Sequence, residues 1–156
     1  MKLTPRKIKL FLLFKLPSAF FSGVRVKSIS ADEVVVRVRH CWINQNPFKS
    51  LYWATQGMAS ELATGILVMQ AVEECKEKFS TLVTQQKGAF TKKATGNIVF
   101  SCKDSSKIND ALTTSIKTGE GQIVLLKSNG FDEAGDCVSS FEYEWSVKVR
   151  SKSTNN

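Results

Sequence analysis

Residues 46–65 read NPFKSLYWATQGMASELATG, and they open the longest helical pattern in the chain. The pattern continues to about Gln70, and a densely charged segment, 73–78, follows it. Apolar side chains recur there at steps of three and four residues, which places them on one face of a helix. These side chains are Leu51, Met58, Leu62, Ile66 and Met69. The spacing therefore predicts one long, buried helix over 51–70 that frays or passes into a surface loop in the charged segment.

Strand patterns lie on both sides of this helix. Before it, two Val-rich segments at 24–29 and 34–39 predict a hairpin. After it, segments rich in Val, Ile, Phe, Thr and Trp are bounded by glycines. They predict further strands at 79–90, 97–103, 122–128 and 137–150.

The last of these segments has the clearest alternation. From Phe141 to Arg150 apolar and polar residues alternate, so one face of that strand is buried and the other faces water. Residues 104–117 have the spacing of a short amphipathic helix that connects two strands. The order of elements indicates a two-layer α+β domain.

The N-terminal segment 2–21, KLTPRKIKLFLLFKLPSAFF, is basic and then apolar. Lys15 and Pro17 interrupt the apolar run, and it is too short to cross a bilayer as a continuous helix. We expect a helix from near Pro5 to near Pro17, with apolar side chains around most of its circumference, so a membrane-surface or dimer contact stays open. The predicted organisation is an N-terminal helix (1–22) packed on one domain (23–150), then a disordered tail (151–156).

Composition narrows the class of protein. A chain of 156 residues with 42% hydrophobic residues is suited to one core. The net charge is +8, but the sequence contains no run of five basic residues and no zinc-finger or RNA-binding signature. We therefore expect no nucleic acid partner. The four cysteines form no CxxC pair and the single His40 completes no zinc-ligand cluster. We expect free thiols in the cytoplasm and no metal.

Glu61 interrupts the apolar length of the long helix. Small residues flank it at helical spacing, among them Ala54, Gly57, Thr64 and Gly65. A carboxylate on such a face could act as a general base or nucleophile on a ligand that approaches closely. The alternatives are a partly buried carboxylate bonded to neighbouring backbone, or a face that is simply wet.

The segment also resembles a known family. The spacing of Asn46, the helix start at Tyr52, Trp53 and Ala54, and the acidic Glu61 is similar to that of hot-dog-fold acyl-thioester hydrolases of the phenylacetate-pathway type. A closer resemblance is to an uncharacterised thioesterase-like branch of that superfamily, a domain of unknown function. Three stretches carry this resemblance: PSAFFSGVRV at 17–26, SELATG at 60–65 and FTKKATGNIVF at 90–100.

The resemblance implies a hot-dog fold, in which a curved antiparallel sheet of five to six strands wraps a long central helix, here with an extra N-terminal helix. It also implies a homodimer, possibly a tetramer, with the site at the dimer interface. The substrate would be an acyl group on coenzyme A or a carrier protein, and coenzyme A would enter only as part of that substrate.

The resemblance assigns roles to residues. Glu61 would be the nucleophile or base, and Asn46 would orient substrate or water. Backbone N–H groups near Trp53 and Ala54 would polarise the thioester carbonyl. The residues expected to line the substrate are Tyr52, Trp53, Ala54, Gln56, Gly57, Ser60 and Thr64. Of these, Gln56, Ser60 and Thr64 are polar residues of the helix whose alternative role is on the helix surface or in packing.

The chain departs from the family pattern at the start of the helix. Tyr52, Trp53 and Ala54 stand where the thioesterases have His-Gly-Gly. A tryptophan there could keep a carbonyl away from the backbone. The alternative function is therefore a noncatalytic binder of acyl or other apolar ligands. Lys92 and Lys93 are candidates for the phosphates of coenzyme A, although a solvated sheet edge explains them equally well.

Overall fold

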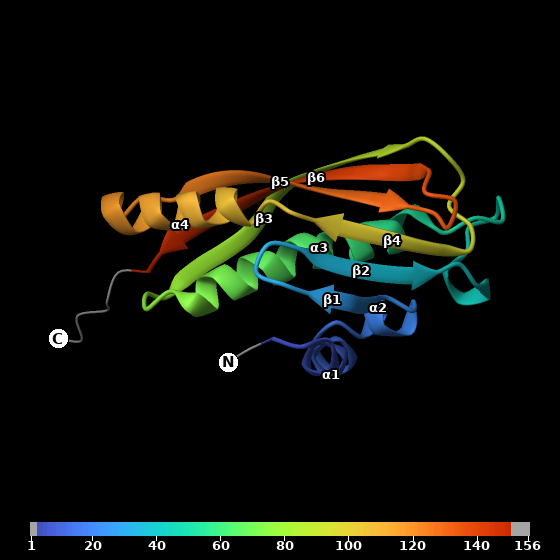
Figure 1. Cartoon of the computed structure of the whole chain (residues 1–156), viewed down its shortest axis with the longest axis horizontal. Coiled ribbons are helices and arrows are strands. Elements are labelled where there is room, and N and C mark those ends of the chain that lie inside the picture. The colour runs from blue at the N-terminus through green and yellow to red at the C-terminus, as the bar shows by residue number, and fades with distance from the viewer. Residues whose placement is uncertain (1–2, 151–156) are drawn as a thin grey trace.

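The computed structural model describes residues 3–150, and the tail expected to be disordered, 151–156, lies outside the described residues. Six strands form one antiparallel sheet, and a long helix runs along one face of it (Figure 1). The elements are α1 (Pro5–Lys15), α2 (Pro17–Phe21), β1 (Arg25–Ile29), β2 (Val34–Arg39), η1 (Trp42–Asn44), α3 (Trp53–Glu74), β3 (Phe79–Phe90), β4 (Asn97–Cys102), α4 (Ser105–Thr118), β5 (Gln122–Phe131) and β6 (Cys137–Val149).

The order of strands across the sheet is β1-β2-β4-β5-β6-β3. Each neighbouring pair is antiparallel, and the longest pairings join β6 to β5 and to β3. Short strand β1 forms one edge of the sheet and β3, with 12 residues, forms the other. The predicted α+β hot-dog architecture is confirmed, since the strands curve around a single central helix (Figure 1).

Helix α3 is the centre of the core. Its small residues Ala59 and Ala63 are fully buried, which lets the helix backbone approach the sheet closely, and Ile66 and Leu67 fill the space beside them. The helix covers 53–74 rather than the predicted 51–70, so Glu73 and Glu74 are still helical, and the surface loop expected in the charged segment begins at Cys75. The stripe is also less uniform than predicted, because Met69 is 39% exposed.

The N-terminal segment forms two helices where the sequence predicted one. Helix α1 buries Ile8 and Leu12 in the core, and the Thr4 side chain caps its start by accepting a hydrogen bond from Lys7 N (3.3 Å). Pro17 cannot continue the first helix, because it has no N–H to donate, and it instead begins α2. No helix in residues 3–150 combines the length and the apolar character that crossing a bilayer requires.

Strand β5 is longer than predicted and contains a glycine with a packing role. The sequence placed the end of this strand at residue 128, but the structure extends it to Phe131. Gly130 pairs directly with Phe100 of β4, which is fully buried and lies against the ring of Phe141. A side chain at position 130 would occupy the place of the Phe100 ring, so the glycine belongs to the core rather than to a turn.

Candidate functional site

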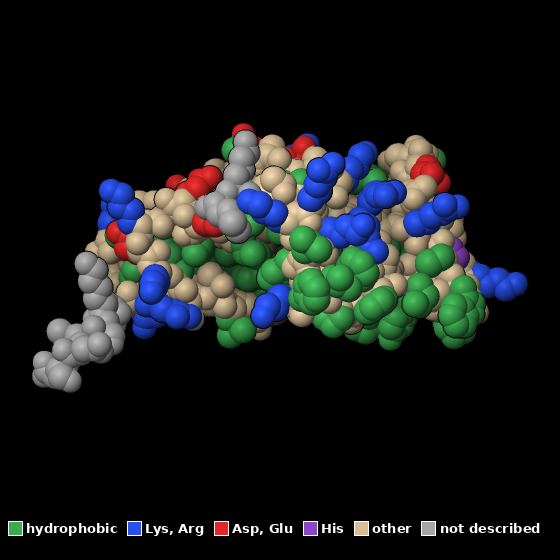
Figure 2. Space-filling model, turned by 90° about the horizontal axis from the view of Figure 1, so that it is seen from below, with side chains coloured by type: hydrophobic (Ala, Val, Ile, Leu, Met, Phe, Trp, Pro, Cys, Tyr) green, Lys and Arg blue, Asp and Glu red, His purple; other side chains and the backbone are tan. Residues whose placement is uncertain are grey.

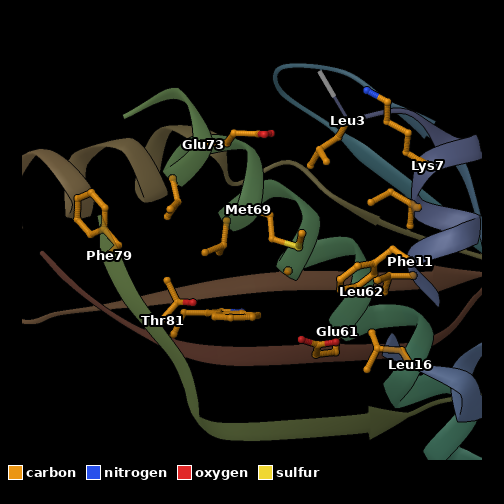
Figure 3. A pocket seen from close by; sticks show the side chains of 15 residues that line it. Leu3, Lys7, Phe11, Leu16, Glu61, Leu62, Met69, Glu73, Phe79 and Thr81 are labelled. Atoms are coloured by element: carbon orange, nitrogen blue, oxygen red, sulfur yellow. The ribbon is translucent and has the colours of Figure 1, made fainter. Parts of the chain in front are cut away.

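A cavity of about 650 Å³ lies between α1, α3 and the β3 end of the sheet. Its walls are mostly apolar and come from Ile8, Phe11, Leu62, Met69, Phe79 and Trp145, among others. Glu61 is one of the few charged groups among the lining residues, and Figure 3 shows its side chain beside Leu62 and Leu16. The volume falls within the range typical of small-ligand pockets.

The carboxylate of Glu61 is half-buried in this cavity. Burial raises the pKa of Glu61 above its ordinary value of 4.5, because the charged form loses hydration. A carboxylate with a raised pKa is a stronger base than an exposed one. The surroundings therefore suit Glu61 to accept a proton or to attack an electrophile.

Gly65 makes room for the carboxylate one helical turn away. A Cβ at this position would lie 3.3 Å from Glu61 Oε1 and 3.6 Å from the Trp145 ring. Gly57, two turns earlier, is different, since no atom would lie within 4 Å of a Cβ there. Of the two glycines that interrupt the helix, only Gly65 has the Glu61 carboxylate and the Trp145 ring packed against it.

This difference between the two glycines gives a matched pair of substitutions. Gly57→Ala and Gly65→Ala should each gain about 0.5–1 kcal/mol of helix propensity. We expect Gly57→Ala to raise the free energy of unfolding by that amount. Gly65→Ala should gain less and should move the Glu61 carboxylate by a few tenths of an ångström. Urea denaturation of both variants checks this, and an equal gain at both positions would contradict the role given to Gly65.

Ser60 and Thr64 connect α3 to strand β6. Ser60 Oγ lies 2.6 Å from the hydroxyl of Tyr143, which also donates to the Gly57 carbonyl (3.0 Å). Trp145 Nε1 donates to Thr64 Oγ1 (3.1 Å). Four residues of helix span about 6 Å along α3, and two residues of strand span about 6.8 Å along β6. The spacing of Ser60 and Thr64 therefore matches the spacing of Tyr143 and Trp145.

Tyr143 and Trp145 belong to the site region although the sequence did not single them out. Burial raises the pKa of Tyr143 to about 12; the bond to Ser60 opposes this rise and the nearby Glu61 charge adds to it. The alternation of β6 placed both residues on the buried face, and buried Tyr and Trp need hydrogen-bond partners. That requirement was the signal that could have linked them to Ser60 and Thr64.

The other predicted site residues gather at the start of α3, away from this cavity. Asn46 holds the turn before the helix: its Oδ1 accepts from Phe48 N (2.9 Å) and its Nδ2 donates to Ser50 Oγ (3.0 Å). With Trp53 and Gln56 it lines a separate depression, which shares no lining residue with the Glu61 cavity. Within one chain the structure does not bring Asn46 to Glu61.

The remaining residues at the helix start differ in exposure. Tyr52 and Trp53 are 44% and 53% exposed, with their rings edge to face, and Ala54 is half-buried. Gln56 is buried, donates to the Leu51 carbonyl (3.1 Å) and accepts from Ser139 Oγ (2.8 Å). The exposed aromatic pair is therefore available to a ligand or a second chain, whereas the Gln56 amide has its partners within the fold.

The two candidate phosphate-binding lysines are both engaged. Lys92 Nζ lies 2.6 Å from Asp132 and 2.7 Å from Asp136, and these bonds raise its pKa. Lys93 Nζ donates to the Phe48 carbonyl (3.3 Å). The two ion pairs of Lys92 stabilise the turn between β5 and β6, so this lysine has a structural role. Among residues 3–150 no three His, Cys, Asp or Glu side chains cluster as metal ligands.

Comparison with known families decides where the chain belongs. A family described as "Domain of unknown function (DUF4442)" matches residues 5–147. The chain is a DUF4442 protein. No curated protein matches it in sequence.

Solved structures share the fold of this DUF4442 chain. A protein of unknown function from Pseudomonas aeruginosa, described as a probable thioesterase, is 19% identical with a TM-score of 0.77, over 94% of this chain and 97% of that one. A protein of unknown function from Chlorobaculum tepidum is 15% identical, with a TM-score of 0.79 over 94% of each chain. A thioesterase from Haemophilus influenzae is 10% identical, with a TM-score of 0.71 over 99% and 97%. The resemblance to an uncharacterised thioesterase-like branch is confirmed.

Proposed function

We propose that this chain hydrolyses acyl thioesters, with Glu61 as the general base or nucleophile. The observation that carries the proposal is a single half-buried carboxylate, with a raised pKa, in a mostly apolar cavity large enough for an acyl group. The fold shared with two solved proteins described as a thioesterase or a probable thioesterase supports the same reaction class. The substrate is an acyl group carried on coenzyme A or a carrier protein.

In the proposed reaction Glu61 either accepts a proton or acts as the nucleophile. The carboxylate accepts a proton from a water molecule while the water oxygen attacks the thioester carbonyl carbon. The carbon–sulfur bond then breaks, the proton passes to the departing sulfur, and a carboxylic acid and a thiol are released. If Glu61 instead attacks directly, an anhydride forms with loss of the thiol, and water then hydrolyses it to the same products.

We propose that a second copy of the chain completes the site. Asn46 and the N–H groups at the start of α3 do not reach the Glu61 cavity of their own chain. Strand β3 offers a 12-residue sheet edge with Leu82 65% and Phe90 50% exposed, which favours pairing with the same edge of a second copy. In such a homodimer the partner subunit supplies the missing polar groups.

A noncatalytic binder of acyl or other apolar ligands is the second candidate. It is favoured by Trp53, which stands at the first position of α3 where thioesterases of similar pattern have a small residue. The apolar cavity serves a binder equally well, because apolar burial alone retains an acyl chain.

Thiol release from a series of acyl-coenzyme A thioesters of increasing chain length separates the two candidates. We expect saturable release above the buffer rate for at least one thioester, from a protein whose light-scattering mass is that of a dimer. Native mass spectrometry of the same sample detects retained acyl ligand. Bound ligand without release of thiol would overturn the hydrolase and support the binder.

A further inference from the structure

The net charge of this protein comes entirely from its first 60 residues. They hold ten Lys and Arg residues and only two acidic ones, Asp32 and Glu33, which accounts for a charge of +8. The rest of the chain holds twelve residues of each sign and is neutral overall. Before Asp32 there is no acidic residue at all, although this part of the chain includes α1, α2 and β1.

The same part of the chain exposes large apolar side chains. Helix α1 turns Ile8 and Leu12 into the core, and Leu10 and Phe14 lie four residues apart on its outer side. Phe21 of α2 and Trp42 and Ile43 of η1 are exposed as well. Each of these five side chains is between 58% and 83% exposed, which is unusual for a group of this size and chemistry.

These three elements lie together on one face. Helix α2 follows α1 directly, and the Asn44 side chain of η1 donates to the Ser22 carbonyl just after α2 (2.9 Å). Figure 2 looks onto the side of the molecule where α1 and α2 lie in Figure 1, and it shows a broad hydrophobic patch bordered by Lys and Arg. We call the patch formed by Leu10, Phe14, Phe21, Trp42 and Ile43 the N-terminal face.

We propose that the N-terminal face docks on an anionic lipid membrane. Exposed Leu, Phe and Trp can enter the headgroup region, and lysines beside them are attracted to acidic lipids. The exposed Lys9 and Lys15 on α1 occupy this position. A symmetric contact between two copies through this face would instead bring the same basic groups together, which is unfavourable. Charge complementarity thus selects a lipid surface over a second copy.

Docking would also place the Glu61 cavity next to the lipid. Helix α1 presents Leu10 and Phe14 outward, and its Ile8 and Phe11, with Leu16 after it, line the cavity wall (Figure 3). An acyl group leaving the membrane would therefore pass along the same helix that holds the protein there. This step rests on the proposed function, whereas lipid binding does not require hydrolysis.

Vesicle sedimentation without any thioester tests the docking by itself. The probes are phosphatidylcholine vesicles and the same vesicles with about one third phosphatidylglycerol. We expect at least about tenfold tighter binding to the anionic vesicles, weakening as salt is raised. Trp42 is 83% exposed, so its emission should shift to shorter wavelength on the anionic vesicles. Trp53 is also exposed (53%) but is not part of the N-terminal face, and Trp145 is buried. The shift should therefore be absent in Trp42→Phe and should persist in Trp53→Phe.

Two matched pairs of variants locate the binding. Phe14→Ser should weaken vesicle binding about tenfold, whereas Ile123→Ser, at a comparably exposed apolar residue of β5, should not change it. Lys9→Glu with Lys15→Glu should weaken it at least tenfold, and Lys76→Glu with Lys117→Glu, which changes the net charge equally, should have a smaller effect. All six substituted residues are exposed, so circular dichroism should show unchanged folding.

Several outcomes would overturn the proposal. Equal binding to both vesicle types, or no binding to either, removes the role of anionic lipid. Equal losses in the β5 control and in Phe14→Ser remove the N-terminal face as the contact. If Phe14→Ser lowers the oligomeric mass in solution, the N-terminal face is an interface between two copies of the chain. If the protein binds duplex RNA more tightly than it binds vesicles, the N-terminal face is a nucleic-acid surface. Vesicle binding by a protein that releases no thiol would leave the docking intact and remove only the hydrolase.

Discussion

Glu61→Gln should lower thioester hydrolysis at least about a hundredfold, because removal of a positioned general base typically costs that much or more. Gln keeps the size of the side chain, so the packing against Gly65 and the Trp145 ring stays the same. Glu74→Gln is the matched control, since Glu74 is exposed at the end of the same helix. Full activity in Glu61→Gln would remove Glu61 from the mechanism.

The rate should also depend on pH through this residue. The reaction needs the ionised carboxylate, and burial raises the pKa of Glu61 above the ordinary glutamate value. Activity is therefore expected to fall, as the pH is lowered, at a higher pH than an exposed glutamate would give. The pH profile of kcat/KM in the wild-type protein measures this pKa, and a profile flat down to about pH 4 would contradict it.

The same pKa shift predicts an effect on stability. A raised pKa means that the folded protein holds the Glu61 proton at pH values where the unfolded chain has lost it. This contribution to stability is fully present below the unfolded pKa and is lost as the pH rises through the folded pKa. Gln has no proton to lose, so Glu61→Gln should gain stability relative to wild type between about pH 4 and pH 7.

Denaturant titrations of both proteins at each pH measure this difference in the free energy of unfolding. A difference that stays constant or shrinks as the pH rises would show that Glu61 is not desolvated in the folded protein. If the prediction holds, Glu61→Gln loses activity and gains stability. That combination is expected of a carboxylate that is buried for its function at a cost in stability.

Gly130→Ala should lower the free energy of unfolding by about 2–3 kcal/mol through overpacking. A Cβ at this position would lie 2.5 Å from Phe100 Cε1 and 2.8 Å from Cζ of the same ring. Phe100 has no exposed surface and also packs against Phe141, so its ring cannot move aside without disturbing the core. The substitution tests whether β4 and β5 are joined as tightly as the geometry indicates.

Gly121→Ala is the matched control for this prediction. A Cβ at position 121 would meet Lys148 at 3.8 Å, an ordinary contact, so we expect a change within about 0.5 kcal/mol. Replacing Phe100 by Leu in the Gly130→Ala background should recover part of the lost free energy of unfolding, because the smaller Leu side chain leaves room for the Cβ at position 130. Urea denaturation of the single and double variants measures the coupling, and purely additive losses would contradict the clash.

Much of the fold was readable from local patterns. The alternation in β6 and the Val-rich hairpin of β1 and β2 appear in the structure close to their predicted limits, since a period of two residues is an intrinsic property of a strand with one buried face. The long helix was also recognised from its spacing, although its end was misplaced. Charged residues at 73 and 74 stay helical in α3, because their solvent exposure costs the helix nothing.

The candidate site was only partly readable. Glu61 was noticed because a carboxylate interrupts an apolar stripe, but its partners come from distant segments: Trp145 lies on β6, and Phe11 lies on α1. The grouping of Asn46 with Glu61 followed family spacing alone, and in one chain the structure holds them in separate cavities. The basic and apolar character of the N-terminal segment was recognised from the sequence, with a membrane contact as one possibility. The concentration of the net charge in the first 60 residues was missed, because it depends on where acidic residues are absent.

The sequence by itself determined the order and approximate limits of most helices and strands, the single core and the presence of an unusual acid in a buried helix, because these depend on residue type and local periodicity. Only the tertiary structure decided what surrounds that acid, which side chains pack against Gly65 and Gly130, and which apolar residues stay outside the core. Those properties depend on contacts between segments far apart in the chain. No local pattern records which distant side chain will occupy a given space.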